Sequence, residues 1–410
     1  MSNDKQPEIR FPEFTEAWEQ RKLASMTNYK NGKGHEDKQS TIGKFELINL
    51  NSISISGGLK HSGKFIDEAD DTLQKDDLVM ILSDVGHGDL LGRVALIPED
   101  DRFVLNQRVA LLRPNATADP QFLFSYINAH QYYFKAQGAG MSQLNISKGS
   151  VENFISFVPI IEEQKKIGTF FKQLDDTIAL HQRKLDLLKE TKKGFLQKMF
   201  PKNGAKVPEI RFPGFTEDWE ERKLGDMMDV TSVKRIHQSD WTNSGIRFLR
   251  ARDIVSAAKN EEPSDYLYIS EEKYNEYSKI SGKVSQGDLL VTGVGSIGVP
   301  LLITDDNPIY FKDGNIIWFK NEHKIDGNFF YYSFINNKIQ KYIRDVAGIG
   351  TVGTYTIDSG KKTPISLPTY DEQIKIGSFF KQFDHTIMLH QHELDLLKET
   401  KKGFLQKMFV

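Results

Sequence analysis

Glu163 to Phe200 read EQKKIGTFFKQLDDTIALHQRKLDLLKETKKGFLQKMF, and Glu372 to Phe409 read EQIKIGSFFKQFDHTIMLHQHELDLLKETKKGFLQKMF. Apolar residues recur in steps of four and three along both copies of this helical repeat, which is the a/d seam of a coiled coil. The first seam is Ile167, Phe171, Leu174, Ile178, His181, Leu185, Leu188, Lys192, Phe195 and Met199. The second is Ile376, Phe380, Phe383, Ile387, His390, Leu394, Leu397, Lys401, Phe404 and Met408. Each narrow seam needs one partner helix, so we expect the two copies to pair with each other.

Polar residues interrupt both seams at matching positions. His181 and His390 could act as a pH switch or a ligand pair. A polar residue on a coiled-coil seam more often sets register and orientation, and we favour that interpretation for both histidines and for Lys192 and Lys401.

A second repeat precedes each half of the chain. Pro7 to Leu23 read PEIRFPEFTEAWEQRKL, and Pro208 to Leu224 read PEIRFPGFTEDWEERKL. This short repeat, a variable region (24–161 or 225–370) and the helical repeat follow one another twice. The chain is therefore an internal duplication of two half-chains, with a period too long for a solenoid.

The variable regions share little sequence, but both alternate strand-like and helix-like segments at uneven spacing. This pattern predicts a mixed α/β or α+β domain in each half. We expect a globular domain at 1–161, a helix at 162–200, a linker at 201–207, a second domain at 208–370 and a helix at 371–410. Gly194 and Gly403 predict a kink or an early end in the last turns of the helices.

Composition excludes several kinds of site. The chain has no cysteine, which rules out disulfides and thiolate chemistry, and its ten histidines form no HExxH motif, so we expect no metal site. The net charge of -2 argues weakly against a nucleic-acid partner, although a chain with a near-neutral net charge can still have one basic face. No apolar run reaches the length of a membrane span and the start is polar, so we expect a cytoplasmic protein.

Three short motifs suggest cofactor chemistry. Gly293 to Gly298 match GxGxxG, but a strand-like run follows where a phosphate-binding loop should open a helix, so we favour a turn between strands. Gly348 to Gly353 match the same pattern without a strand before them. Asn307 to Tyr310 (NPIY) are similar to the NPPY of adenine methyltransferases, but one proline is missing and a loop is favoured.

Polar and basic residues cluster in the predicted loops of both variable regions. Arg, Lys, Asn, Gln and Ser side chains read base edges or hold phosphates. The candidate DNA-binding residues of the first region are Lys30, Lys33, His35, Lys60, Lys64, Ser83, His87, Arg93, Gln107, Arg108, Ser142, Gln143 and Asn145. Those of the second are Lys234, Arg235, Arg247, Arg250, Arg252, Thr292, Ser296, Lys312, Asn315, Thr351, Thr354 and Tyr355. Any single loop of this kind is more often an ordinary solvated surface than a DNA contact.

This order of repeats and variable regions resembles the specificity subunits of type I DNA restriction and modification systems. The resemblance covers the whole chain and rests on PEIRFPxFTExWExRKL and EQxKIGxFFKQ around two dissimilar regions. It implies that each variable region is a target recognition domain for one half of a bipartite DNA site. It also implies that the helices form an antiparallel pair, related by a pseudo-two-fold axis, that holds the domains apart and docks the methyltransferase subunits.

The resemblance further implies a chain without catalytic residues or a cofactor of its own. Its expected partners are double-stranded DNA, two modification (methyltransferase) subunits that bind S-adenosylmethionine, and restriction (translocase and nuclease) subunits. A helix of the predicted length spans about 57 Å, so the two readers would meet DNA about one helical turn apart and leave a spacer unread. A duplicated coiled-coil scaffold that binds proteins without recognising DNA sequence stays open as the alternative.

Overall fold

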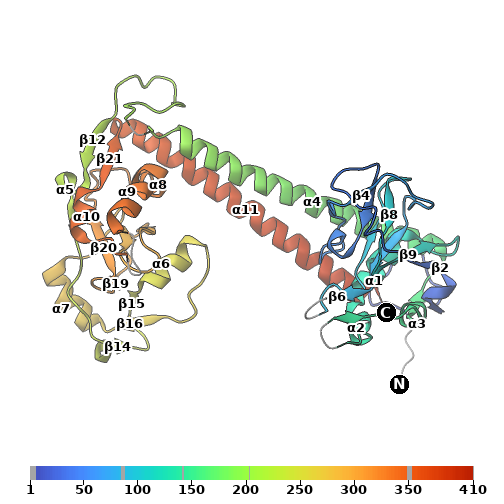
Figure 1. The fold of residues 1–410 in the computed structure, drawn as a ribbon. Coiled ribbons are helices and arrows are strands. Elements are labelled where there is room, and N and C mark those ends of the chain that lie inside the picture. Colours follow the sequence, from blue (N-terminus) through green and yellow to red (C-terminus); the bar gives the residue numbers. More distant parts are fainter. Residues whose placement is uncertain (1–5, 85–87, 141–142, 203, 349–352, 410) are drawn as a thin grey trace. The chain divides into compact units, whose positions relative to one another are not determined.

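The structure, a computed structural model, describes residues 6–84, 88–140, 143–202, 204–348 and 353–409. The chain divides into two compact units. Unit 1 holds Met1–Arg183 with His392–Val410, and unit 2 holds Lys184–Gln391. Each unit therefore contains one globular domain and one end of each of the two long helices (Figure 1).

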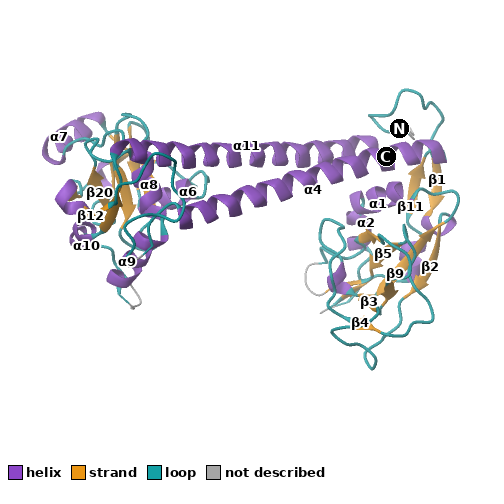
Figure 2. Ribbon diagram, turned by 90° about the horizontal axis from the view of Figure 1, so that it is seen from above, coloured by secondary structure: helices purple, strands orange, loops and turns teal. Residues whose placement is uncertain are grey.

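The helical repeats form α4 (Ile161–Lys198) and α11 (Tyr370–Met408). Both are uninterrupted helices, as Figure 2 shows, so the expected early end at Gly194 or Gly403 is wrong. Every predicted seam residue is buried or half-buried. None of the described helices is both long and apolar enough to cross a membrane.

In unit 1, α4 and α11 run antiparallel. The ring centroids of Phe170 and Phe404 lie 5.0 Å apart, and Asp175 pairs with Lys401. His181 Nδ1 lies 3.6 Å from Glu393 Oε2. The contacts move forward along α4 and backward along α11, so the helices pair in opposite directions.

Unit 2 repeats this pairing. The rings of Phe195 and Phe379 lie 5.3 Å apart, and the seam residue Lys192 pairs with Asp384. The Tyr332 hydroxyl donates to the same carboxylate at 2.6 Å. Each seam lysine thus meets an aspartate of the opposite helix at a matching position, an arrangement that favours one register.

The domain of unit 1 is built on a four-stranded antiparallel sheet, β2-β9-β5-β7, beside a smaller sheet, β4-β3-β8. Its helices and strands in chain order are β1 (Glu19–Lys22), β2 (Thr27–Asn31), β3 (Phe45–Ile48), β4 (Phe65–Ile66), β5 (Leu78–Ile81), β6 (Ser83–Asp84), β7 (Val94–Leu96), β8 (Phe103–Leu105), β9 (Val109–Pro114), α1 (Pro120–Ala129), α2 (Gln131–Ala136), β10 (Leu144–Asn145), α3 (Lys148–Glu152) and β11 (Ile155–Val158).

The domain of unit 2 has the corresponding sheets β13-β20-β17-β18 and β14-β16-β15-β19. Its elements are β12 (Glu220–Lys223), α5 (Leu224–Met227), β13 (Asp229–Thr231), β14 (Trp241–Thr242), β15 (Ile246–Leu249), α6 (Ala251–Ala258), β16 (Leu267–Ile269), α7 (Glu271–Ser281), β17 (Leu289–Thr292), β18 (Pro300–Leu302), β19 (Ile309–Phe311), β20 (Ile316–Lys320), α8 (Gly327–Ile335), α9 (Asn337–Ala347), α10 (Ile357–Lys362) and β21 (Pro364–Leu367). The expected mixed α/β class is confirmed, and the central four-stranded sheets of both domains have the same strand order.

The two repeats together anchor each domain to its helices. Arg10 of the short repeat makes two hydrogen bonds of 2.7 Å to the fully buried Glu163 of α4. Gln164 then accepts from the backbone N–H of Asp119 at 3.0 Å, and its amide donates to the carbonyl of Pro159 at 2.9 Å. In unit 2, Arg211–Glu372 and Gln373 make the equivalent contacts.

The end of one long helix closes the core of each domain. Phe409, just after α11, packs edge-on against Phe122 in unit 1, with ring centroids 5.6 Å apart. Phe200, just after α4, stacks on Phe329 in unit 2 at 5.7 Å. The aromatic ends of the two helical repeats thus serve matching cores, which explains why both ends carry the same sequence.

Gly168 and Gly194 in α4 differ in what surrounds them, and this difference predicts opposite effects of alanine. A Cβ at Gly168 would lie 2.5 Å from Asp119 Oδ1, the N-cap of α1, and 2.8 Å from the N atom of Phe122. A Cβ at Gly194 would meet nothing within 4 Å.

We expect Gly168→Ala to lower the free energy of unfolding of unit 1 by about 2 kcal/mol. Gly194→Ala should raise stability by up to about 1 kcal/mol. Urea denaturation of both variants checks this, and equal effects would contradict it.

Candidate nucleic-acid interface

Most of the predicted loops of the first domain meet at one end of its central sheet, where β2 and β5 end and β9 begins. The N–H of Leu82 donates to the carbonyl of Arg108 at 3.0 Å, and the N–H of Ile146 donates to that of Leu82 at 2.9 Å. The N–H of Gly32 donates to Val109 at 3.0 Å. We call the surface formed by residues 30–35, 83–84, 106–108 and 143–145 sheet end 1.

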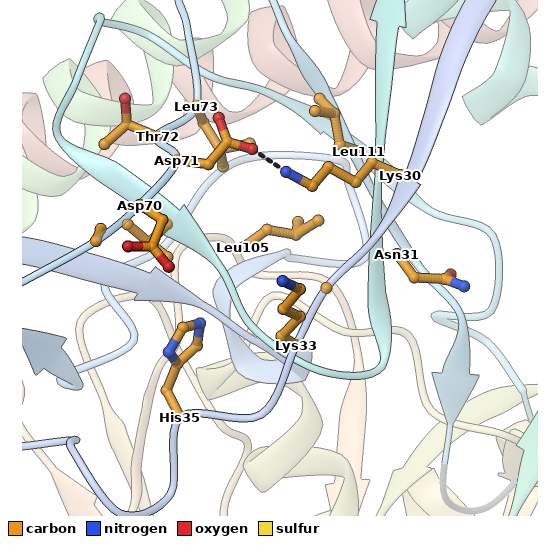
Figure 3. A pocket seen from close by; sticks show the side chains of 13 residues that line it. Lys30, Asn31, Lys33, His35, Asp70, Asp71, Thr72, Leu73, Leu105 and Leu111 are labelled. Atoms are coloured by element: carbon orange, nitrogen blue, oxygen red, sulfur yellow. Dashed lines mark hydrogen bonds and ion pairs between the residues drawn. The ribbon is translucent and has the colours of Figure 1, made fainter.

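A pocket of about 80 Å³ opens in sheet end 1. Figure 3 shows Lys30, Lys33 and His35 on one side of it and Asp70 and Asp71 on the other. Lys30 is paired with Asp71, whereas no carboxylate partner is described for the exposed Lys33. The sequence did not single out the two aspartates, because they lie in an unremarkable acidic stretch nearly forty residues after the basic loop.

The amide and hydroxyl candidates of sheet end 1 form a network. The Ser83 hydroxyl donates to Asn145 Oδ1 at 2.7 Å and accepts from the Gln143 amide. Asn145 itself is exposed, and its position is fixed by the pairing of β6 with β10. His87 and Ser142, also predicted, lie outside the described residues.

Arg108 occupies the turn between β8 and β9. Its φ of 66° lies in the left-handed region, which costs a non-glycine residue about 1 kcal/mol. The residue is exposed, and no hydrogen bond or ion pair of its side chain is described, whereas the neighbouring Gln107 amide donates to Glu36. The turn thus holds an exposed guanidinium in a constrained backbone conformation, which keeps Arg108 a candidate for a ligand contact.

The second domain gathers its candidates at the corresponding place. The N–H of Gly293 donates to the carbonyl of Asn315, and the N–H of Tyr355 donates to that of Gly293, both at 2.8 Å. A pocket of about 440 Å³ is lined by Ser232, Gly293, Gly314, Thr354 and Tyr355 among others. We call the surface formed by residues 232–235, 292–296, 312–315 and 354–355 sheet end 2. Thr351 lies outside the described residues.

Not every candidate in sheet end 2 is free to bind. Thr292 is fully buried, and its hydroxyl donates to the carbonyl of Ser296 and accepts from the N–H of Val299. Burial raises the pKa of Tyr355, whose hydroxyl shares a hydrogen bond with Thr363. Arg235 is exposed, and no ion pair of its side chain is described, so it contributes an open positive charge.

Two more cations complete sheet end 2. Lys234 lies over the ring of Tyr277, 4.4 Å from its centroid. It is exposed and follows β13 as Lys33 follows β2 in the first domain. The N–H of Lys312 donates to the carbonyl of Leu249 at 2.8 Å, and the side chain is half-buried.

Several predicted residues lie elsewhere. Arg93 donates to the carbonyl of Asn128 at 3.2 Å, and burial lowers the pKa of its guanidinium. Lys60 and Lys64 lie in the segment between β3 and β4 and are exposed.

Three further arginines lie at or just after β15. Arg250 and Arg252 both pair with Asp265, and Arg250 also pairs with Asp253. Arg247 lies on β15 with its guanidinium carbon 3.7 Å from the centroid of the Tyr266 ring. Sequence reasoning missed Tyr268 of β16 and Tyr266 just before it, although tyrosines two apart in an extended segment face the same side.

The segments that suggested cofactor chemistry have other places in the fold. Gly293 to Gly298 connect β17 to the antiparallel strand β18 and open no helix. Tyr310 belongs to β19 and is buried, with its hydroxyl donating to the carbonyl of Lys234 at 2.8 Å. Of the second glycine motif, residues 349–352 lie outside the described part.

Comparison with known families agrees with this duplicated architecture. The sequence matches the family described as type I restriction modification DNA specificity domain twice, over residues 15–190 and 216–399. The chain belongs to this family. The two matches fall one on each half of the duplication, so this specificity chain carries two copies of the family's domain.

Individual relatives support the assignment of this specificity chain. It is 27% identical over 316 residues to the type I restriction enzyme MjaVIII specificity subunit of Methanocaldococcus jannaschii, covering 72% of this chain and 71% of the relative. It is 25% identical to the putative MjaX specificity subunit of the same organism, covering 96% and 93%.

Solved structures share the fold at low sequence identity. The S subunit of a type I system from M. genitalium superimposes with a TM-score of 0.61 at 16% identity, covering 99% of both chains. A chain from a structure on complex assembly and conformational transition of a type I system gives a TM-score of 0.55, covering 95% and 97%. The fold of the whole chain, including both helical repeats, is therefore that of type I S subunits.

Proposed function

We propose that this chain reads a bipartite, asymmetric site on double-stranded DNA, with sheet end 1 reading one half-site and sheet end 2 the other. The observation that carries the proposal is the convergence of the predicted loops on the same end of the same sheet in both domains. One fold presents two different sets of side chains, so two different half-sites are expected.

Open positive charges support DNA as the ligand. Lys33 and Arg108 in sheet end 1 and Arg235 in sheet end 2 are exposed cations for which no carboxylate partner is described. Such side chains hold phosphates or read base edges. The near-neutral net charge of the chain is thus compatible with two local basic surfaces.

The long helices would set the spacer and dock the modification subunits. Four leucines of the helical repeats point into solvent, Leu180 and Leu187 on α4 and Leu389 and Leu396 on α11, with 48–67% of each exposed. They occupy matching positions of the two repeats, seven residues apart on each helix. Exposed apolar patches mark protein interfaces, and matched patches fit two copies of one partner.

In this proposal the chain is the non-catalytic subunit. The partner methyltransferase subunits bind S-adenosylmethionine and modify adenine, and restriction subunits join the full complex. What this chain contributes is the choice of sequence and the distance between the two half-sites.

Selection from a random duplex library tests the proposal. The chain is assembled with its modification subunits, and the retained DNA is sequenced. We expect two enriched blocks separated by positions without preference. A complex that assembles but enriches no sequence would contradict the proposal and favour a protein-binding scaffold.

A further inference from the structure

Arg247 differs from the other arginines near β15. Arg250 and Arg252 are held by Asp253 and Asp265. For Arg247 no hydrogen bond or ion pair is described, and its Nη1 atom is buried without a hydrogen-bond partner. A buried donor left unpaired is unfavourable, and no hydrogen bond from the described residues offsets this cost.

Aromatic rings fix the plane of this guanidinium. Its central carbon lies 3.7 Å from the centroid of Tyr266 and 6.0 Å from that of Tyr268. Tyr268 is the direct cross-strand neighbour of Arg247, and the Tyr266 hydroxyl is held by Glu262. A guanidinium stacked on a ring holds its N–H donors in one plane. Because Nη1 is buried, the edge that carries Nε and Nη2 is the one that would meet a ligand.

The strand that carries Arg247 leads into sheet end 2. The last residue of β15, Leu249, accepts from the N–H of Lys312, the first residue of the 312–315 segment. Arg247 is two residues earlier on the same strand, about 7 Å from Leu249 along it. Its position is next to the surface proposed to contact DNA.

The corresponding position of the first domain has the opposite charge. β3 pairs in parallel with β8 as β15 does with β19, and Glu46 holds the place of Arg247 in this register. Glu46 is buried and accepts from the N–H of Ser62 at 2.6 Å. In the first domain the residue at this position is therefore held by hydrogen bonds of the fold. In the second domain the residue at this position has no described hydrogen bond or ion pair.

We propose that Arg247 is a specificity-determining residue that reads one guanine of the half-site bound by the second domain. Two coplanar acceptors, O6 and N7, line the major-groove edge of guanine and match the fork of a guanidinium held in one plane. This inference rests on the proposed function and assigns one base contact within it.

The test compares Arg247→Lys and Arg247→Gln with the unmodified chain, each assembled with its modification subunits and applied to the random duplex library. Arg222→Lys is the matched control, because Arg222 is exposed, is paired with Glu220 and is not a candidate DNA contact. Arg247→Lys keeps the positive charge but lacks the two coplanar N–H donors of the guanidinium. We expect both Arg247 variants to lose preference for one guanine in one block, with affinity for the best site falling roughly 10- to 100-fold. The other block and the control should not change.

Three outcomes would overturn the assignment. An unchanged motif in assembled Arg247→Lys would make the residue structural. A loss of affinity that is equal for all DNA sequences, with a salt dependence of binding reduced by about one phosphate contact, would make Arg247 a contact to the DNA backbone. If the unmodified complex selects no bipartite motif, the proposed function itself fails, which separates that failure from an error at Arg247 alone.

Discussion

Glu163→Ala is expected to lower the free energy of unfolding of unit 1 by about 3 to 5 kcal/mol, because it leaves a mostly buried arginine without its counter-charge. Glu163 is fully buried, and only 11% of the Arg10 side chain is exposed. The hydrogen bonds from Arg10 to Glu163 raise the pKa of the guanidinium. The substitution removes these hydrogen bonds, but an arginine side chain is not deprotonated in proteins and therefore stays charged. Urea denaturation followed by tryptophan fluorescence checks the loss, since Trp18 lies in the core of this unit.

Two controls separate the ion pair from general damage. Glu163→Met combined with Arg10→Met removes both charges and should restore most of the lost stability, because an apolar pair can replace a buried ion pair. Glu372→Ala breaks the equivalent pair of unit 2 and should destabilise that unit, which contains Trp219, and leave unit 1 unchanged. A loss below about 1 kcal/mol for Glu163→Ala would show that the pair does not anchor the domain.

Exchange of residues 24–161 for the matching region of a relative with a different target is expected to replace one half-site and leave the other intact. The anchor should survive, because the described hydrogen bonds of Gln164 to the variable region go to backbone groups, those of Thr117, Asp119 and Pro159. Backbone contacts do not depend on the exchanged side chains. Sequencing of the modified sites checks the result, and a change in both half-sites would contradict the assignment of one domain to one half-site.

The repeated segments made the architecture predictable. Nearly identical segments in both halves predicted a duplicated domain. The steps of four and three along Ile167, Phe171 and Leu174 predicted long helices, because residues at this spacing lie on one face of a helix. The structure has these helices at Ile161–Lys198 and Tyr370–Met408. The early helix ends predicted from Gly194 and Gly403 were wrong, because contacts with the partner helix outweigh the low helix propensity of glycine.

The surfaces were predictable only as sets of loops. That Lys33 and Lys234 follow corresponding strands could not be read from two variable regions with little common sequence; it follows from the pairing of β2 with β9 and of β13 with β20. Residue type also could not separate Arg247 from Arg250 and Arg252. Their difference depends on Asp265, which approaches only through the fold of the chain between α6 and β16.

Sequencing of modified bases in a host that expresses this chain with its modification partner tests the central claim most directly. We expect one asymmetric motif in which two short, different blocks flank a spacer of constant length and any base composition. A single uninterrupted motif, two identical blocks, or modification without sequence preference would contradict it.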